Sequence, residues 1–231
     1  MALTKYKFKN VFGQPLQRWD DLKPLGATTD GFVIDANQSF IAFVLSSGGG
    51  IDLGILNHNQ TGRVQNIPRL RGHQGPITDF KFLPHLNNLI ASCSEDTTIK
   101  IWQLQDDNKE DIVQPQQNLN GHHKKINLLC PHLHSQGILA SSSYDNTVQI
   151  WDIEQGKSLF SIKQDSKVAL SLDWSQEGSI LGSSWNDKMV KKYIYILYYK
   201  KKDENNRSQT IINSRIILSS LRLQSLEIRM D

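Results

Sequence analysis

The chain has 231 residues and a formal net charge of +3. This surplus comes from the C-terminal end: positions 188–231 contain 10 Lys or Arg and 4 Asp or Glu, whereas positions 1–187 contain 16 and 19. Most of the chain is therefore not basic, and a nucleic-acid partner has little support. The sequence shows no basic-then-apolar leader and no apolar run long enough to cross a bilayer, which argues against secretion and a membrane span.

Residues 1–29 are expected to form an N-terminal segment ahead of the first sheet. The stretch over residues 5–23 reads KYKFKNVFGQPLQRWDDLK. From residue 40 the pattern is strand, glycine turn at 48–50, strand, and a second turn at 60–63. Such alternation of β-branched runs and turn residues predicts a small antiparallel sheet, which we place at about residues 30–70.

An internal repeat follows. Residues 72–102 and 121–151 align without a gap at an offset of 49, and each copy has Gly-His near its start, a Ser-x-Asp turn and a Trp at its end. A period in the forties with these marks is typical of WD-repeat propeller blades. We therefore expect two further four-stranded blades, at about residues 71–119 and 120–163.

The resemblance to WD repeats also implies a buried polar network in each copy. In such blades the turn Asp pairs with the His, and the His is linked to a strand Ser and to the Trp indole. A satisfied network of this kind orders a blade, because each of its polar groups is costly when buried without a partner. The residues at these positions are His73, Ser92, Asp96 and Trp102 in the first copy, and His122, Ser141, Asp145 and Trp151 in the second.

A third, degenerate copy of the repeat is predicted at about residues 164–191. Counting from Asp187 places Ser183 at the strand Ser position and Tyr193 at the Trp position, and Gln164 or Asp165 replaces the His. The expected fold class is therefore all-β: an incomplete WD-repeat β-propeller of about three to four blades within residues 30–191. Residues 192–231 are expected to be a divergent basic tail outside the propeller.

Most of the chain resembles the N-terminal part of the coronin family. The resemblance lies in residues 6–15 (YKFKNVFGQP), in Ser47–Gly50, in Thr61–Arg63, and in GHQGP at residues 72–76 leading to SED at 94–96. It covers roughly residues 5–191. What it implies is a seven-bladed propeller that binds filamentous actin in the cytoplasm, at the actin cytoskeleton and cell cortex, with no catalytic activity and no cofactor.

The resemblance also implies candidate actin-binding residues. Within the family, a motif of two acidic residues, an aliphatic and a basic residue contributes to filament binding, and residues 20–23 (DDLK) match it. Lys23 stands where Arg is usual, which keeps the charge but removes the planar guanidinium fork. Lys7, Lys9 and Arg63 are lesser candidates, and a solvated surface role is the alternative for all four.

Other kinds of site are less well supported. Ser92, His73 and Asp96 are the residue types of a hydrolase triad, but they recur once per repeat and neither Ser lies in a Gly-x-Ser-x-Gly elbow. His123, His132 and His134 are expected to be surface histidines rather than metal ligands. Cys93 and Cys130 are expected to be reduced structural thiols. The glycines at 48–50 lack the Lys and helix of a phosphate-binding loop.

The tail leaves two interpretations open. In the first, the chain is a truncated or misassembled gene product whose last forty residues come from a retained intron or a frame slip. In the second, it is a genuine short form whose Arg215, Arg222 and Arg229 would lie on one basic face of a helix. Neither provides the C-terminal coiled coil by which full coronins oligomerise.

The sequence thus predicts a non-enzymatic actin-filament binding protein of coronin type, with other cytoskeletal proteins as further partners. The alternative is a WD-repeat scaffold that binds other proteins and has no affinity for actin, because a propeller fold does not by itself define the partner.

Overall fold

The computed structural model describes residues 19–20, 22, 33–47, 50–59, 62–63, 66–105, 110–163, 168–186, 189–194 and 218–222. Within these ranges the secondary structure is entirely strands, turns and bends, which confirms the all-β prediction. No helix of the described residues has the length and apolar character needed to cross a membrane.

Four sheets of four strands each follow one another along the chain, and we call them blades 1 to 4. Blade 1 has β2 (Ile34–Ala36), β3 (Phe40–Ser47), β4 (Gly50–Asn57) and β6 (Arg69–Leu70). Blade 2 has β7 (Ile77–Phe82), β8 (Leu89–Ser94), β9 (Thr98–Gln103) and β10 (Gln117–Asn120). Blade 3 has β11 (Ile126–Pro131), β12 (Ile138–Ser143), β13 (Thr147–Asp152) and β14 (Lys157–Lys163). Blade 4 has β15 (Ala169–Trp174), β16 (Ile180–Trp185), β17 (Met189–Ile194) and β18 (Leu218–Arg222).

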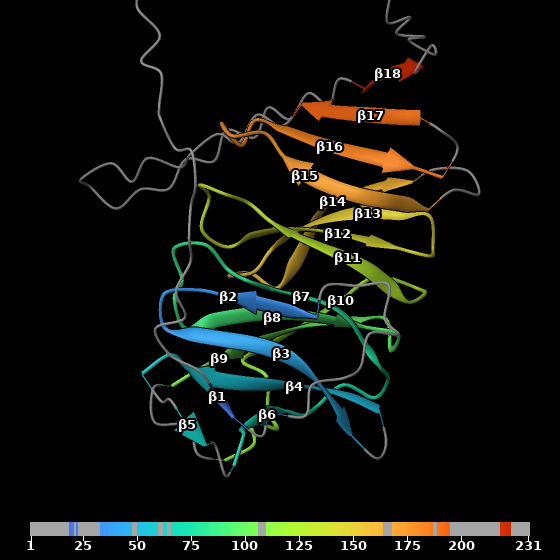
Figure 1. The fold of residues 1–231 in the computed structure, drawn as a ribbon. Helices are drawn as coiled ribbons and strands as arrows, with labels where there is room; N and C mark the ends of the chain where they lie inside the picture. Colours follow the sequence, from blue (N-terminus) through green and yellow to red (C-terminus); the bar gives the residue numbers. More distant parts are fainter. Residues whose placement is uncertain are drawn as a thin grey trace, which may run out of the picture.

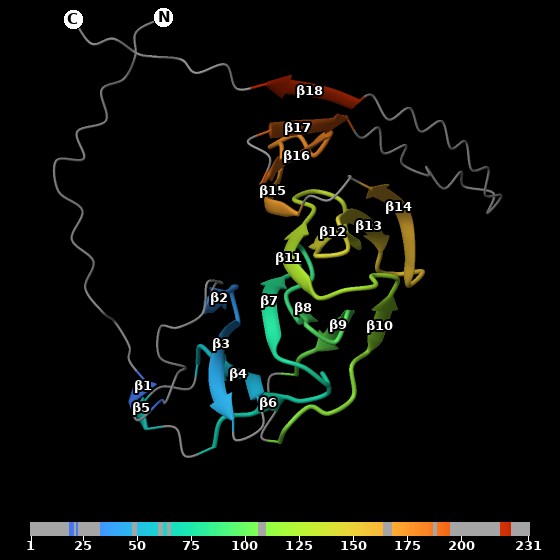
Figure 2. The ribbon, with the colours of Figure 1, turned by 90° about the vertical axis from the view of Figure 1, so that its right-hand side faces the viewer.

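All strands within a blade are antiparallel neighbours, as in a meander. The blades are stacked face to face, from blade 1 at the bottom of Figure 1 to blade 4 at its top. Figure 2 shows the first strands β2, β7, β11 and β15 along one side of this stack. The result is an arc of propeller blades that does not close on itself.

Apolar side chains fill the spaces between the blades. One buried cluster joins blades 1 and 2 and includes Phe40, Leu53 and Phe80. A second joins blades 2 and 3 around Ile101 and Leu129, and a third joins blades 3 and 4. Because each sheet is buried on a face that meets its neighbour, burial of apolar area holds the blades together.

The first strands of neighbouring blades are also linked by polar side chains. Thr78 Oγ1 donates a hydrogen bond of 2.6 Å to Ile126 O in blade 3. Asn127, one repeat later, donates through Nδ2 to Ala169 O in blade 4 over 2.9 Å. These bonds fix how neighbouring sheets are aligned along their first strands.

Two carboxylates make a second set of links between first strands. Asp35 Oδ2 accepts the Phe82 N–H at 2.9 Å, and Asp79 Oδ2 accepts the Leu129 N–H at 2.8 Å. Asp79 is 2% exposed, and burial raises its pKa to about 6, although hydrogen bonds from the Leu129 and Phe80 N–H groups act against that shift. The bond to Leu129 therefore joins blades 2 and 3 through a carboxyl group that burial makes harder to ionise.

The end of blade 4 differs from the expected boundaries. Residues 192–194 continue β17, and residues 218–222 form β18, which pairs with β17 from Met189↔Arg222 to Tyr193↔Leu218. Part of the expected non-propeller tail thus supplies the last strand of a blade. Arg222 lies in a strand rather than in the helix that the seven-residue spacing suggested, whereas Arg215 and Arg229 lie outside the described residues.

Candidate functional site

A hydrogen-bonded network in blade 2 brings together the four residues at the repeat positions. His73 Nδ1 lies 2.8 Å from Asp96 Oδ2, and His73 Nε2 lies 2.8 Å from Ser92 Oγ. The Trp102 indole Nε1 donates to the same Ser92 Oγ over 2.8 Å. The network joins the loop before β7 to β8, β9 and the turn between them.

The donor and acceptor roles in this network follow from the chemistry of its ends. An indole N–H can only donate, so Ser92 Oγ accepts from Trp102 and can give its own proton to His73 Nε2. His73 Nδ1–H then donates to the Asp96 carboxylate. Burial lowers the pKa of His73, although the nearby Asp96 charge acts against that shift, and the neutral ring with Nδ1 protonated satisfies every partner.

Asp96 also organises the turn. Its Oδ1 accepts from the Thr98 N–H at 2.9 Å and from the Thr98 hydroxyl at 2.7 Å, while Oδ2 accepts from the Gln74 N–H at 2.9 Å. Burial alone would raise the pKa of Asp96, but these hydrogen bonds and the nearby His73 outweigh it and hold the pKa below its ordinary value. The carboxylate therefore stays charged and ties the turn to the Gly-His loop.

Blade 3 repeats this geometry at the offset of 49. His122 contacts Asp145 Oδ2 at 2.9 Å through Nδ1 and Ser141 Oγ at 2.7 Å through Nε2, and Trp151 Nε1 donates to Ser141 Oγ over 2.8 Å. Burial acts to raise the pKa of Asp145, but hydrogen bonds from His122 and Thr147 prevail and lower it.

The glycine of each Gly-His pair is required by the Trp. A Cβ placed on Gly72 would lie 2.9 Å from Cη2 of Trp102 and equally close to the Val113 carbonyl oxygen. A Cβ on Gly121 would lie 2.9 Å from the corresponding atom of Trp151. The Gly-His pair therefore reflects the close approach of the indole to the backbone in addition to the histidine network.

The Ser-His-Asp groups of blades 2 and 3 stabilise the blades and do not form a substrate site. Ser92 and Ser141 are fully buried, so no substrate can reach either hydroxyl, and each hydroxyl is already bonded to a His and a Trp. Within the described ranges no three His, Cys, Asp or Glu side chains are grouped so that they could hold a metal ion. Burial raises the pKa of Cys130 to about 12 and that of Cys93 still further, so both thiols stay protonated.

The prediction of a surface position is wrong for His132. This side chain is 3% exposed and packs on Trp174, with ring centroids 4.7 Å apart. Its Nδ1 accepts from the backbone N–H groups of His134 and Ser135, and Nε2 donates to Gly178 O in blade 4 over 2.9 Å. The histidine thus links blades 3 and 4, whereas His123 and His134 are exposed.

Blade 4 uses a smaller arrangement that the repeat offset missed. The Trp185 indole donates to Ser183 Oγ over 2.6 Å, and both residues lie in β16, two positions apart on the same face of the strand. Of the residues that the offset selected, Tyr193 lies in β17, and Gln164, Asp165 and Asp187 lie outside the described residues. The sequence did contain a signal for this bond, because Trp185 follows Ser183 by two positions and therefore lies on the same face of the strand.

The candidate contact segment lies against the outer face of blade 1. Strand β1 (Trp19–Asp20) pairs in parallel with β5 (Gly62–Arg63), so that Asp20 lies opposite Arg63. Trp19 and Leu22 pack on a buried cluster formed by Phe43, Leu45 and Leu56. Of the candidate basic residues, Arg63 has its backbone described in β5, and Lys7, Lys9 and Lys23 lie outside the described residues.

Comparison with known proteins assigns this architecture to a family. Residues 3–63 match a domain of unknown function, DUF1899, and residues 64–103 and 113–152 match the WD domain, G-beta repeat. Coronin-2B of Xenopus laevis and that of Homo sapiens are each 38% identical to the chain over 190 residues, which are 80% of this chain and 40% of theirs. The chain belongs to the coronin family.

A solved coronin structure supports this assignment and the propeller fold. The WD40 domain of Toxoplasma gondii coronin superposes with a TM-score of 0.73 at 31% identity, covering 78% of this chain and 46% of that one. The C-terminal WD40 domain of Sif2, at 20% identity and a TM-score of 0.56, shares the fold alone. The predicted coronin resemblance and incomplete propeller are thus confirmed, and the chain spans about 40% of the length of the coronins it matches.

Proposed function

We propose that this coronin-type chain binds actin filaments and helps to organise the actin cytoskeleton in the cytoplasm and at the cell cortex. The supporting observation is the 38% identity to Coronin-2B over 190 residues, together with the DDLK motif at residues 20–23. The resemblance to coronins implies filament binding through the basic residue of that motif.

The packing of the motif on blade 1 supports a role for Lys23 in this contact. Trp19 and Leu22 anchor the segment on the apolar cluster of blade 1, and the pairing of β1 with β5 brings it beside Arg63 in the backbone. A basic residue that directly follows an anchored Leu22 loses less freedom on binding than one on an unanchored chain. In our proposal Lys23 and Arg63 contact an acidic filament surface together.

The proposed function is non-enzymatic. Both buried Ser-His-Asp networks are saturated by bonds within their own blades. A binding protein needs no more than a rigid arrangement of surface groups, and the networks order blades 2 and 3 beside blade 1, which carries the candidate segment. Other cytoskeletal proteins are further proposed partners.

Co-sedimentation with actin filaments tests the proposal. The folded chain should pellet with filaments, and Lys23→Asp should weaken pelleting about tenfold, in line with loss of one charged contact and introduction of a repulsive one. Lys23→Arg should bind as well as the natural chain or better, since guanidinium forms bidentate bonds to carboxylates. Lys157→Asp, which changes an exposed lysine of β14, is the matched control.

Two outcomes would contradict the proposal. If the folded natural chain stays in the supernatant, the chain acts instead as a WD-repeat scaffold without affinity for actin. If Lys23→Asp and Lys157→Asp reduce pelleting equally, the effect is one of net charge, and the motif at residues 20–23 is not the contact.

A further inference from the structure

Blades 2 and 3 hold one exposed loop and one exposed turn together in the same way. In blade 2, Ser94 Oγ donates to Gly75 O over 3.0 Å, and the Glu95 N–H donates to Pro76 O over 3.0 Å. These bonds join the loop before β7 to the turn between β8 and β9. The loop is thereby fixed by its backbone and by a buried serine.

Blade 3 makes both bonds at the equivalent positions. Ser143 Oγ donates to Lys124 O over 2.9 Å, and the Tyr144 N–H donates to Lys125 O over 2.9 Å. Only the backbone atoms of Lys124, Lys125 and Tyr144 take part in these bonds. The fold therefore does not require lysine or tyrosine side chains at these positions, because Gly75, Pro76 and Glu95 support the same bonds in blade 2.

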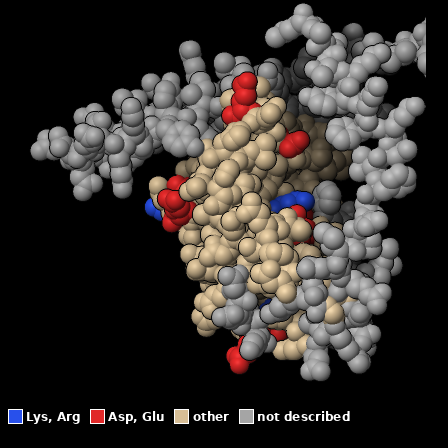
Figure 3. Space-filling model, turned by 60° about the vertical axis from the view of Figure 1, so that its left-hand side comes forward, with Lys and Arg blue, Asp and Glu red and all other residues tan. Residues whose placement is uncertain are grey.

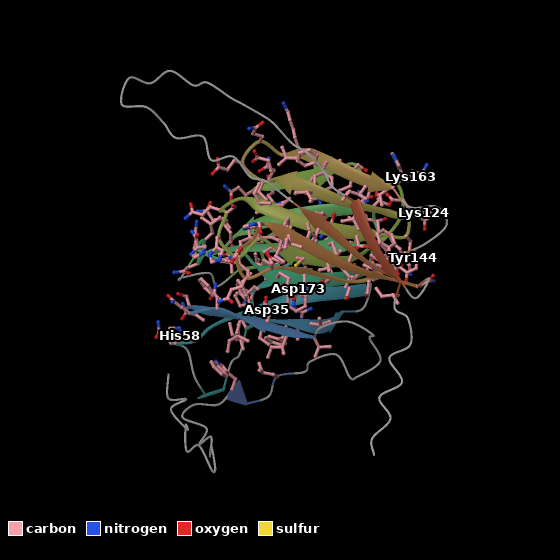
Figure 4. All side chains as sticks on the ribbon, turned by 90° about the horizontal axis from the view of Figure 1, so that it is seen from above. Asp35, His58, Lys124, Tyr144, Lys163 and Asp173 are labelled. Atoms are coloured by element: carbon pink, nitrogen blue, oxygen red, sulfur yellow. The ribbon has the colours of Figure 1, made fainter. Side chains whose placement is uncertain are left out.

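The exposed side chains of the two blades differ sharply in charge. Blade 2 presents Gly, Pro and Glu where blade 3 presents Lys124, Lys125 and Tyr144. Lys163 adds a third ammonium group. It pairs with Thr147, the first residue of β13, which directly follows the turn that contains Tyr144. Figure 4 shows Lys163, Lys124 and Tyr144 along the same side of the molecule. We call these four residues the blade 3 patch.

The patch is partly preorganised. Lys125 Nζ lies 4.7 Å above the centre of the Tyr144 ring, which attracts a cation through its electron-rich face. The same Nζ lies 3.4 Å from Glu95 Oε1 of blade 2. Lys125 and Tyr144 each remain 44% exposed, so both can still meet a partner.

We infer that the blade 3 patch is a binding surface for a short acidic segment of another protein. Two or three carboxylates can pair with Lys124, Lys125 and Lys163, and the flat Tyr144 ring offers contact area at low entropic cost. An extended phosphate backbone fits less well, because Glu95 borders the patch and positions 1–187 carry more acidic than basic groups. Figure 3 shows another face of the molecule, on which a few acidic and basic side chains are scattered over a largely uncharged surface.

The internal repeat supplies a substitution that keeps the scaffold. The variant Lys124→Gly, Lys125→Pro, Tyr144→Glu places the side chains of the second blade on the third, where the backbone bonds already match. Binding of a fluorescein-labelled decaglutamate peptide to the full chain is measured by fluorescence anisotropy in low salt. We expect this variant to bind at least fivefold more weakly than the natural chain, with an unchanged far-ultraviolet circular dichroism spectrum.

A control variant and two competing probes distinguish the alternatives. Lys157→Glu is the control. Lys157 begins β14, whereas the patch residue Lys163 ends it, so Lys157 lies away from the patch. This variant should bind the peptide within twofold of the natural chain. A labelled decaglutamine peptide should not bind. Equal loss in the transfer variant and in Lys157→Glu would overturn the inference, as would binding of a DNA duplex or of phosphatidylserine vesicles in preference to the acidic peptide. The inference does not depend on filament binding, because it concerns blade 3 and a different probe.

Discussion

Blades 2 and 3 differ from blade 4 in how a buried tryptophan is satisfied. In blades 2 and 3, one serine hydroxyl joins the indole to a histidine, and the histidine reaches a carboxylate in the turn. In blade 4, Trp185 reaches Ser183 of the same strand. The longer network ties two strands, a loop and a turn into one unit, whereas the bond between Trp185 and Ser183 lies within one strand.

The largest expected effect comes from removing a networked indole. Trp102→Ala should lower the free energy of unfolding by about 3–5 kcal/mol, because it leaves a cavity and also leaves Ser92 Oγ without its donor. Urea unfolding followed by circular dichroism measures this. Trp185→Ala is the comparison, and it should cost less, since Trp185 anchors a shorter network. Equal losses would show that burial alone, and not the network, determines the effect.

The serine substitutions make the same comparison without a large cavity. Ser141→Ala leaves both His122 Nε2 and Trp151 Nε1 without a partner and should cost about 2–4 kcal/mol, since each unsatisfied buried group costs about 1–3 kcal/mol. Ser183→Ala removes one hydrogen bond, the one that Ser183 Oγ accepts from the Trp185 indole. It should cost roughly half as much in the same urea titration. A larger loss for Ser183→Ala would contradict this ranking.

The sequence predicted the contacts that recur at the repeat offset, and it missed contacts between residues that this offset does not relate. The four residues of each network recur at one offset, because blades 2 and 3 bring the same positions of loop, strand and turn together. The bond between Trp185 and Ser183 escaped the offset, since a tryptophan within the same strand can replace one on the next strand. The buried position of His132 was also missed, because its partner Gly178 lies 46 residues away in blade 4.

The tail shows a different limit of prediction. Its basic composition suggested a segment outside the propeller, yet β18 needs only five residues that can extend and pair with β17. Pairing of an edge strand depends on backbone groups, which every residue except proline provides in full. Composition therefore says little about which residues complete a sheet.

The link between blades 2 and 3 should depend on pH through Asp79. Its folded pKa of about 6 is above the ordinary value of 3.8, so the folded state binds more protons between these values. Its contribution to stability is therefore full below pH 4 and is lost as the pH rises through 6, by about 2–3 kcal/mol in total. Asp79→Asn removes this titration, so its stability relative to the natural chain should increase between pH 4 and pH 7. An unchanged difference across this range would contradict the prediction.

The smallest expected effect concerns the two hairpin turns. Thr97 and Asn146 occupy equivalent positions with φ of 70° and 66°. Asparagine tolerates this left-handed conformation, whereas a β-branched residue is strained in it. Thr97→Asn should therefore raise the free energy of unfolding by about 0.5–1 kcal/mol. Thermal unfolding measures this, and Asn146→Thr should show the opposite sign. A destabilised Thr97→Asn would mean that the Thr97 side chain makes a compensating contact.

The links between first strands have a consequence for the shape of the molecule. Thr78 and Asn127 join the first strands of consecutive sheets by hydrogen bonds, whereas apolar side chains that extend to the last strands, such as Leu119 and Phe160, fill the space between the sheets. Sheets that are hydrogen-bonded along one edge and separated by apolar side chains toward the other edge diverge from the bonded edge. The short polar side chains of the first strands therefore contribute to the curvature of the arc.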